Sequence, residues 1–411
     1  MVKDKRKCFR KWRRSKSEHD RGEYVRARQR ARKAVSKAKE RGNDELAKEL
    51  ESEEGKQKVF RVAKQMARER VDVTKVNCLK DSRGRLILDE SGKKRVWKEY
   101  MEKLLNEENE WDGEVEAGKK EGPECEICKE EVEWVMRRMK TGKAAGQSGI
   151  VTEMIKAMGE DGVIWMTEIC NRIVRERRIP EDWQRSVLVP IYKGKGDPLE
   201  CGSYRAIKLL EHGMKILEKV LERRIRQIVE LDGMQFGFTP GRGTTDAIFI
   251  VRQLQEKFRA KGRPLYYAFV DLEKAYDRIP REVVRWALRD AGVDEWLVDT
   301  VMSTYKGART VVLTDDGVTE EFEVGVGLHQ GSALSPLLFI IVMDRVSRKV
   351  RGGLPWELLY ADDLVLMAQD LEELKERLRK WKRDMEAKGM RVNLGKTKVM
   401  WGGGTAGGTM G

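Results

Sequence analysis

Histidine and cysteine are scarce in this chain of 411 residues, which has three histidines and six cysteines. Six scattered cysteines are too few for a disulfide framework, so we expect a reducing, intracellular setting. Three histidines argue against a His-rich metal centre. Cys125 and Cys128 form a lone CxxC pair. Zinc would need two more ligands at a matching spacing, so two ordinary thiols in a surface loop are the better interpretation.

Membrane and secretion signals are missing as well. No stretch approaches the ~20 apolar residues that span a bilayer, which excludes a transmembrane protein. The first residues, MVKDKRKCFRKWRR, lack the apolar core of a secretory signal peptide. With 40% hydrophobic and 37% charged residues, we expect a soluble, heavily charged globular protein. The length allows two or three domains of ~100–200 residues each.

Positive charge is abundant and concentrated at the N-terminus. Residues 1–40 hold 17 Lys and Arg against five acids, a net +12 of the +14 on the whole chain. A segment of this density is typical of binding to nucleic-acid phosphates, and Phe9, Trp12 and Tyr24 are suited to stacking on bases. The alternative is a solvated charged helix, or a nuclear-localisation-like tract, that binds nothing else.

Composition divides the chain into four segments. Residues 1–75 are expected to form a basic helical arm, because they are polar and rich in Ala, Arg, Lys and Glu. Residues 76–130 are expected to form an N-terminal extension with a short hairpin, an amphipathic helix and a loop. Residues 131–401 are dense in alternating helix and strand signals. Residues 402–411 are a Gly-rich tail without side chains that could pack.

Apolar spacing predicts several further elements. The predicted amphipathic helix of the extension carries Val96, Trp97, Tyr100, Met101, Leu104 and Leu105. Four more helices are predicted over Gly213 to Leu231, Pro280 to Ala291, Pro336 to Val350 and Leu371 to Lys388. An antiparallel hairpin is predicted from Thr310 to Leu313 and from Phe322 to Val324, with its turn at Asp315-Asp316-Gly317.

One acidic residue follows a strongly apolar strand. Leu265 to Val270 is a continuous apolar, aromatic and β-branched run, which predicts a buried strand. Asp271 comes directly after it. A carboxylate at the end of a buried strand is costly unless it binds a cation or accepts hydrogen bonds.

Two more acids lie in a predicted hairpin. Strands Glu357 to Tyr360 and Leu364 to Ala368 flank a tight turn at Ala361, Asp362 and Asp363. Polar turn chemistry alone would explain one aspartate but not two against so apolar a background. If this hairpin packs beside the strand that ends at Asp271, three carboxylates converge. Two Mg²⁺ ions ~3.5–4 Å apart need this arrangement for phosphoryl or nucleotidyl transfer.

A small-residue loop precedes a buried helix. His329 to Ser332 leads into Ser335-Pro336, a helix-start signal, and then into an almost wholly apolar segment. A Gln-Gly pair there would let a substrate approach the backbone, although an ordinary N-cap turn is the alternative. Upstream, glycine turns carry cations suited to triphosphate or template phosphates, although each alone is more often a surface charge. They are Lys193, Lys195, Arg205 and Arg242.

Together these segments resemble the reverse transcriptase domain of non-LTR (LINE-type) retrotransposons, over about Arg138 to Met400 and more weakly back to Val76. Four motifs in order carry the resemblance: Tyr204 to Ile207, Phe269 to Asp277, Gln330 to Ser332, and Tyr360 to Asp363. The resemblance implies an α+β fold, the right-hand polymerase with fingers and an antiparallel palm sheet, preceded here by the basic helical extension. It also implies RNA-directed DNA polymerase activity.

The resemblance also implies roles for single residues. Asp271, Asp362 and Asp363 would bind two Mg²⁺ ions as catalytic residues. Tyr276 would pack under the incoming sugar and exclude a 2′-hydroxyl. Gln330 and Gly331 would contact the nucleotide and the template. Arg205 and Lys193 would bind the triphosphate, and Lys396 would donate a proton to the leaving pyrophosphate. The partners implied are an RNA template, a DNA primer and dNTPs, without a membrane.

The chain departs from the family pattern in places. Gln147-Ser148-Gly149 and Arg205-Ala206-Ile207 stand where the family often has Pro-Asp-Gly and Arg-Pro-Ile. Endonuclease and thumb segments are not evident, which predicts a truncated element. Self-association and a partner chain are two open sources for these functions. The alternative function is an inactive remnant that only binds nucleic acid. An RNA-dependent RNA polymerase or nucleotide cyclase is a weaker alternative, which Tyr276 argues against. A ribonucleoprotein in nucleus and cytoplasm is expected.

Overall fold

The computed structural model describes residues 2–15, 17–30, 33–34, 78–353 and 355–402. The chain divides into two compact units, Met1–Val71 and Asp72–Gly411. Most of the predicted arm and nearly all of the predicted Gly-rich tail lie outside the described residues. Among the described helices, none combines the length and the apolar character needed to cross a membrane.

The described part of the first unit is helical. Helix α1 (Val2–Ser15) is followed by a second helical stretch at residues 18–30. The rings of Phe9, Trp12 and Tyr24 pack on one another, and those of Trp12 and Tyr24 are stacked with centroids 5.4 Å apart. Lys11 adds ion pairs to Asp20 and Glu23 at 3.0 and 3.1 Å. The aromatic residues that the sequence suggested for base stacking therefore also join the two helical stretches, and their stacking on bases stays a prediction.

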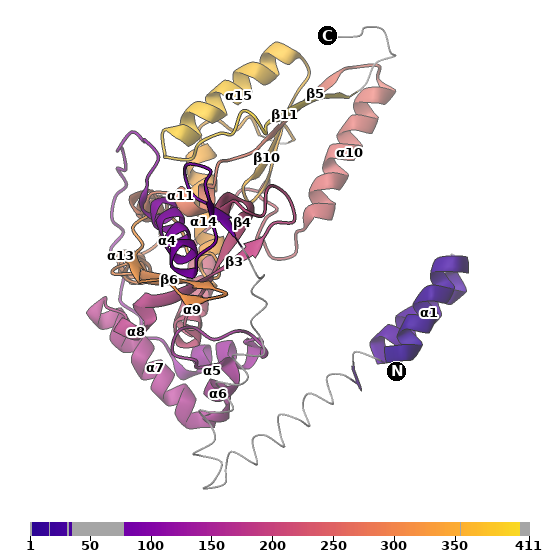
Figure 1. The fold of residues 1–411 in the computed structure, drawn as a ribbon. Helices are drawn as coiled ribbons and strands as arrows, with labels where there is room; N and C mark the ends of the chain where they lie inside the picture. The colour runs from indigo at the N-terminus through magenta and orange to yellow at the C-terminus, as the bar shows by residue number, and fades with distance from the viewer. Residues whose placement is uncertain (1, 16, 31–32, 35–77, 354, 403–411) are drawn as a thin grey trace. The chain divides into compact units, whose positions relative to one another are not determined.

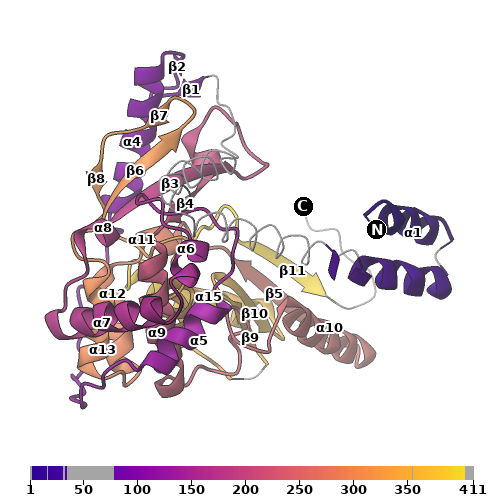
Figure 2. The ribbon, with the colours of Figure 1, turned by 90° about the horizontal axis from the view of Figure 1, so that it is seen from below.

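The second unit contains a four-stranded antiparallel sheet (Figures 1 and 2). Its order is β11 (Lys398–Gly402), β5 (Leu265–Val270), β10 (Asp363–Ala368) and β9 (Glu357–Tyr360). The predicted strands and their hairpin are confirmed, except that the second strand begins at Asp363 itself. The pairing of the hairpin with β5 is confirmed as well, because Leu364 lies opposite Val270.

The two faces of this sheet pack against different helices (Figure 1). Ala268, Val270 and Leu366 belong to the main core, which includes Trp381 of α15 (Leu371–Glu386). Leu265, Tyr267 and Met367 form a smaller cluster, against which apolar residues of α10 (Thr244–Ala260) pack. This alternation follows from the period of two in a strand.

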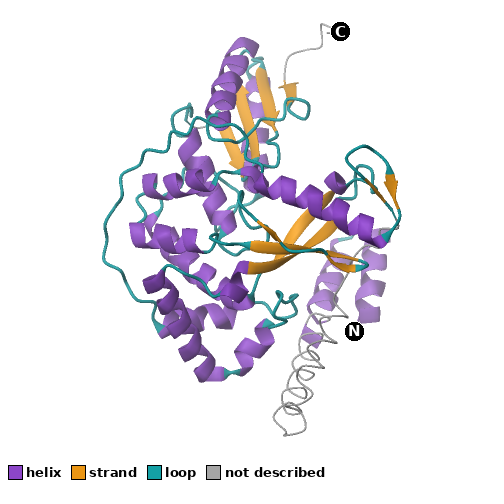
Figure 3. Ribbon diagram, turned by 60° about the vertical axis from the view of Figure 1, so that its left-hand side comes forward, coloured by secondary structure: helices purple, strands orange, loops and turns teal. Residues whose placement is uncertain are grey.

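A second sheet has five strands, and its order is β4-β3-β6-β7 with β8 also paired to β6 (Figure 3). The bounds of its strands are β3 Arg185–Tyr192, β4 Tyr204–Leu209, β6 Arg309–Thr314, β7 Gly317–Val318 and β8 Phe322–Glu323. The predicted hairpin is confirmed: β6 pairs with β7 across Asp315-Asp316 and with β8 farther from the turn. The parallel pairing of β3 with β6 was not predicted.

The predicted hairpin and amphipathic helix before this sheet are confirmed. Strands β1 (Leu79–Lys80) and β2 (Leu86–Ile87) form the hairpin, and α4 (Glu90–Asn106) begins at an Asp89 N-cap. The Asp89 carboxylate accepts a hydrogen bond from the backbone N–H of Gly92 at 2.6 Å. The apolar face of α4 packs with Leu188 and Val312 of the second sheet, so this helix shares that sheet's core.

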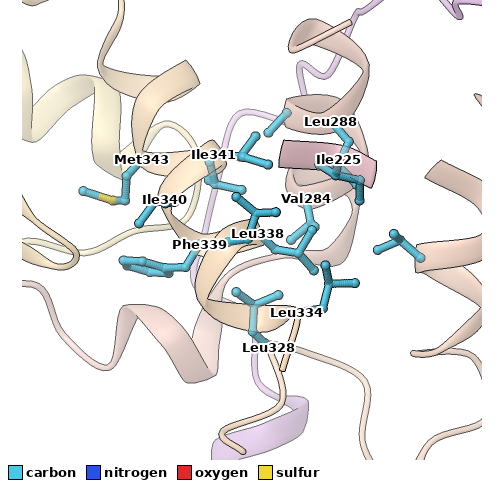
Figure 4. Packing of buried hydrophobic residues seen from close by; sticks show 14 of the residues in the cluster. Ile225, Val284, Leu288, Leu328, Leu334, Leu338, Phe339, Ile340, Ile341 and Met343 are labelled. Carbon is cyan, nitrogen blue, oxygen red and sulfur yellow. The ribbon is translucent and has the colours of Figure 1, made fainter. Parts of the chain in front are cut away.

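Helix α14 (Ser335–Ser347) lies in the main core, packs against α12 (Arg281–Asp290) and α15, and has residues that are almost all buried (Figure 4). Leu338, Phe339, Ile340 and Ile341 are at most 1% exposed. The remaining helices are α5 Lys129–Arg138, α6 Thr152–Ala157, α7 Gly159–Glu176, α8 Glu181–Gln184, α9 His212–Ile228, α11 Ala275–Arg278 and α13 Glu295–Ser303, with a 3₁₀ turn at Cys201–Ser203.

All four helices predicted from apolar spacing end one to three residues earlier than the sequence suggested, and α9 and α14 differ most. Helix α14 ends at Ser347 rather than Val350, because Arg351 turns back and donates hydrogen bonds to the Asp344 carbonyl and the Ser347 hydroxyl. Helix α9 ends at Ile228 rather than Leu231, since Val229 is already extended. Apolar periodicity does not indicate such local capping, so the predicted ends of the helices were less accurate than their predicted positions in the chain.

Removal of one buried side chain of α14 should destabilise the whole second unit. A Leu338→Ala substitution leaves a cavity at a fully buried position, so we expect the free energy of unfolding to fall by about 2–5 kcal/mol. Urea unfolding followed by circular dichroism measures the change. Arg379→Ala, at a position with a 70% exposed side chain, is the control and should change stability by less than ~0.5 kcal/mol. Equal effects of the two substitutions would contradict the packing described here.

Candidate active site

The three predicted carboxylates come together at one end of the four-stranded sheet. Strands β5 and β10 are antiparallel with Val270 opposite Leu364, so the next position on each strand places Asp271 beside Asp363. Asp362 precedes Asp363 in the turn after β9. Residues ~90 positions apart in the sequence are thereby joined by a backbone register rather than by a flexible loop.

These carboxylates repel one another. Burial raises the pKa of Asp363, and the negative charges of Asp362 and Asp271 raise it further. The Oδ2 atom of Asp271 is buried and accepts no hydrogen bond, and its nearby cation is the Lys396 ammonium at 3.5 Å. Like charges this close together suit a bound cation.

Lys396 forms an ion pair with one of these carboxylates. Lys396 Nζ lies 3.5 Å from Asp271 Oδ2, and the Lys396 side chain is 69% exposed. The backbone N–H of Asn393 donates to the Asp271 carbonyl at 2.8 Å and holds the Lys396 loop against β5. Within the described ranges, no three or more His, Cys, Asp or Glu side chains are arranged so that they could hold a metal ion. A metal would therefore require the carboxylates to turn toward it.

Positive charge gathers beside the acids. Lys193 follows β3 and donates from Nζ to the Gly202 carbonyl at 2.8 Å. Burial lowers the pKa of Lys193, and the nearby charges of Arg205 and Lys396 lower it further. The predicted cations Lys193, Arg205 and Lys396 thus lie close enough to repel one another, which favours a polyanionic ligand between them.

Arg242 and Lys195, which the sequence also suggested, differ in their surroundings. The Arg242 guanidinium lies over the ring of Phe236 at 5.5 Å and donates to the Gly233 carbonyl. The Arg242 side chain therefore contacts residues of the loop that carries it. Lys195 is exposed, and its charge contributes to the lowered pKa of Lys193.

The Gln330-Gly331 loop is held by an adjacent strand. The Gln330 carbonyl accepts a hydrogen bond from the backbone N–H of Lys208 in β4 at 2.6 Å. Gln330 Nε2 donates to Asp277 Oδ1 at 2.8 Å. Gly331 has φ +125°, and a Cβ there would lie 2.2 Å from the Lys208 carbonyl oxygen. Only glycine fits this position, so the loop is more than an ordinary N-cap turn.

Tyr276 lies on the short helix α11, just after β5. Its ring packs against Phe339 of α14 with centroids 5.3 Å apart. Burial raises the pKa of the Tyr276 hydroxyl, so the side chain stays neutral. This packing fixes the ring between the buried core and the carboxylate end of the sheet.

Several buried polar residues lie next to the Gln330-Gly331 loop. Sequence reasoning did not identify them as part of the site. The Lys208 ammonium is buried without a hydrogen-bond partner, and burial lowers its pKa to about 7. Glu218 accepts from the backbone N–H of Ala333 at 2.8 Å, and burial raises its pKa. The His329 ring lies 4.5 Å from that of Tyr305. The only sequence signal was a set of ionisable residues inside apolar segments.

Comparisons with known proteins identify a family and several relatives. A family described as reverse transcriptase (RNA-dependent DNA polymerase) matches residues 191–404. The probable RNA-directed DNA polymerase from transposon X-element of Drosophila melanogaster is 26% identical over 364 residues, covering 83% of this chain and 39% of that protein. The Pol polyprotein from type-2 retrotransposable element R2DM of the same species is 29% identical over 269 residues, covering 63% and 25%.

The chain spans two-fifths or less of the length of these two relatives. Among solved structures, apo telomerase from Candida tropicalis, truncated from its C-terminal domain, is similar with a TM-score of 0.42 and 13% identity. That match covers 64% of this chain and 62% of the telomerase chain. The resemblance to non-LTR polymerases that the four motifs indicated is confirmed by the family match and the curated relatives.

Asp277 should give the fold a measurable pH dependence. Burial raises its pKa to about 6, against an ordinary value of about 3.9. The folded state therefore retains the proton to a higher pH than the unfolded chain, so this group's contribution to stability falls as pH rises from about 4 to about 6 and is constant above. Asp277→Asn has no such proton, so its stability relative to the parent should rise across this window.

Urea unfolding of both proteins at pH 4, 5, 6 and 7 measures that difference. Asp182→Asn, at a position with an 81% exposed side chain, controls for removal of a carboxylate from the surface. A difference between Asp277→Asn and the parent that does not change with pH would show that the Asp277 carboxyl is not buried as described.

Proposed function

Because this chain belongs to the reverse transcriptase family, we propose that it is an RNA-directed DNA polymerase of the non-LTR retrotransposon type, extending a DNA primer on an RNA template. The observation that carries this proposal is the convergence of Asp271, Asp362 and Asp363 at one sheet end. Three carboxylates placed together in this way have no evident structural use, since they destabilise one another.

The architecture supports a right-hand polymerase. The four-stranded antiparallel sheet with α14 and α15 would be the palm, which carries the carboxylates. The five-stranded sheet would belong to the fingers, because Lys193 and Arg205 lie on it or next to it. In this proposal residues 131–401 are fingers and palm, residues 76–130 an N-terminal extension, and residues 1–75 a basic arm.

Asp271, Asp362 and Asp363 would hold two Mg²⁺ ions. The repulsion among them supports a cation there, as does the Lys396 ammonium that already lies 3.5 Å from Asp271 Oδ2. Bound Mg²⁺ would activate a primer 3′-hydroxyl and neutralise charge on the triphosphate. The protein would hold the carboxylates in place through the register of β5 and β10. Lys396 would leave Asp271 for the phosphates of the nucleotide when the cation binds.

The remaining residues would bind and orient the dNTP. Lys193 and Arg205 would offer positive charge for the triphosphate, and Lys396 would give a proton to the leaving pyrophosphate. Gln330 and Gly331 would present backbone and amide groups to the nucleotide and template. Tyr276, held against Phe339, would be a rigid wall under the sugar. Each role follows from family resemblance and is compatible with the positions of these side chains.

Primer extension tests the polymerase proposal. The purified chain, an RNA template, a labelled DNA primer, dNTPs and Mg²⁺ should give extended products. Asp362→Asn with Asp363→Asn should reduce extension by at least ~10³-fold, because both substitutions remove negative charge that the ions require. Retained binding of the template–primer by this double variant, measured by fluorescence anisotropy, would assign the loss to chemistry.

A different outcome would favour the non-enzymatic alternative. Absence of extension by the parent chain, with template binding that is lost on removal of residues 1–40, would leave nucleic-acid binding by the basic segment as the function. Equal extension by the parent and the double variant would exclude the assigned carboxylates from the reaction.

Tyr276 should decide which sugar the enzyme accepts. If its ring lies under the sugar, Tyr276→Val should admit rNTPs, raising rNTP incorporation relative to dNTP incorporation by about 10–10³-fold through relief of a clash worth ~1–4 kcal/mol. Single-nucleotide addition with dCTP and CTP provides the two rates. Tyr276→Phe, which keeps the ring, is the control and should discriminate as the parent does. Equal use of both sugars by the parent would remove the role assigned to Tyr276.

A further inference from the structure

The turn that carries the two aspartates is strained. Ala361 has φ +58°, a left-handed conformation that residues with a Cβ rarely adopt. It directly precedes Asp362 and Asp363, and it is 6% exposed. Such a conformation persists only where surrounding contacts impose it. A two-residue hairpin turn between Tyr360 and Asp363 requires a positive φ at this position, and a contact from outside the hairpin adds to what holds Ala361 there.

Gln235 makes that contact from a distant part of the chain. Its side-chain oxygen Oε1 accepts a hydrogen bond from the backbone N–H of Ala361 at 3.0 Å. The same oxygen accepts from the backbone N–H of Gly237 at 2.8 Å. Because both partners are donors, the amide can face the turn only with its oxygen. Gln235 is 1% exposed, so water does not compete for these bonds.

The backbone around Gln235 is fixed to the same hairpin. Phe236 N–H donates to the Leu359 carbonyl at 2.8 Å, and Leu359 N–H donates to the Met234 carbonyl at 3.0 Å. The segment from Met234 to Gly237 therefore runs beside β9 in a parallel bridge. A Cβ on Gly237 would lie 2.3 Å from the nitrogen of Ala361, so only glycine allows this approach.

We propose that Gln235 is a positioning residue of the active site: its amide oxygen holds Ala361 in the left-handed conformation and thereby aims Asp362 and Asp363 at Asp271. This inference rests on the proposed polymerase function for its catalytic consequence. Gln235 does not touch the reacting atoms in this assignment. Its Nε2 atom is buried without a partner, which indicates that the oxygen is the part of the amide the site uses.

Two substitutions separate the oxygen from the bulk of the side chain. Gln235→Met keeps the length but removes the acceptor. Gln235→Glu keeps an acceptor oxygen in the same place, and burial favours the protonated form, whose hydroxyl replaces the Nε2 end that has no partner. With primer extension as the assay, Gln235→Met should lower kcat for single-nucleotide addition about 10–100-fold with a dNTP KM within about threefold of the parent. Gln235→Glu should restore most of kcat.

Ala361→Gly supplies an independent test, because glycine adopts a positive φ without strain. The loss of kcat caused by Gln235→Met should be smaller in the Ala361→Gly background than in the parent. An equal loss in both backgrounds would show that Gln235 does not act through the conformation of Ala361.

Mn²⁺ titration followed by electron paramagnetic resonance provides a readout besides activity. Misaimed carboxylates should bind Mn²⁺ more weakly, so Gln235→Met should raise the dissociation constant severalfold and Gln235→Glu should not. Mn²⁺ binding by a parent that does not extend primers would refute the polymerase proposal and leave the positioning role measurable.

The result that overturns the inference is specific. A folded Gln235→Met variant with parental kcat and Mn²⁺ affinity would refute it, as would equal impairment of the Met and Glu variants. If circular dichroism shows that Gln235→Met does not fold, the Glu variant decides: a folded, active Gln235→Glu supports the acceptor role, and a folded, inactive one contradicts it.

Discussion

The pairing of β5 with β10 is the constraint on which the rest of the site depends. Its register places Asp271 and Asp363 next to each other, with Asp362 in the adjoining turn. The resulting repulsion, together with burial, raises the pKa of Asp363. A fold can tolerate this arrangement only if its remaining contacts supply enough stability. The nearly completely buried helix α14 and the helices around it supply such contacts.

Both loops at the site are held from outside their own elements. The turn before Asp362 is fixed by Gln235, and the Gln330-Gly331 loop is fixed by the backbone of Lys208. At both places a glycine, Gly237 or Gly331, approaches another backbone so closely that any Cβ would clash. Close backbone packing of this kind leaves little freedom for the loops, which is what a preorganised site requires.

The sequence predicted the elements that bear a strong local pattern. The apolar run before Asp271 and the hairpin around Asp362 and Asp363 were predicted correctly, as were the buried faces of α12 and α14. The convergence of Asp271, Asp362 and Asp363 was only a hypothesis from the local patterns. The order of the four motifs, and the family resemblance that it carries, gave that hypothesis its support. The helix ends at Ile228 and Ser347 were missed, because neither a change to extended backbone at Val229 nor the hydrogen bonds of the Arg351 side chain leave a periodic signal.

Long-range polar contacts were beyond sequence reasoning for a different reason. A buried glutamine reads as an ordinary polar residue, and nothing near position 235 indicates that its partner is at position 361. The same holds for Lys396, whose contact with Asp271 spans more than a hundred residues. The rings of Phe9, Trp12 and Tyr24 show the converse, since a composition typical of base stacking also suits packing between helices. Residue type limits what a side chain can bind, and only the fold determines which partner is within its reach.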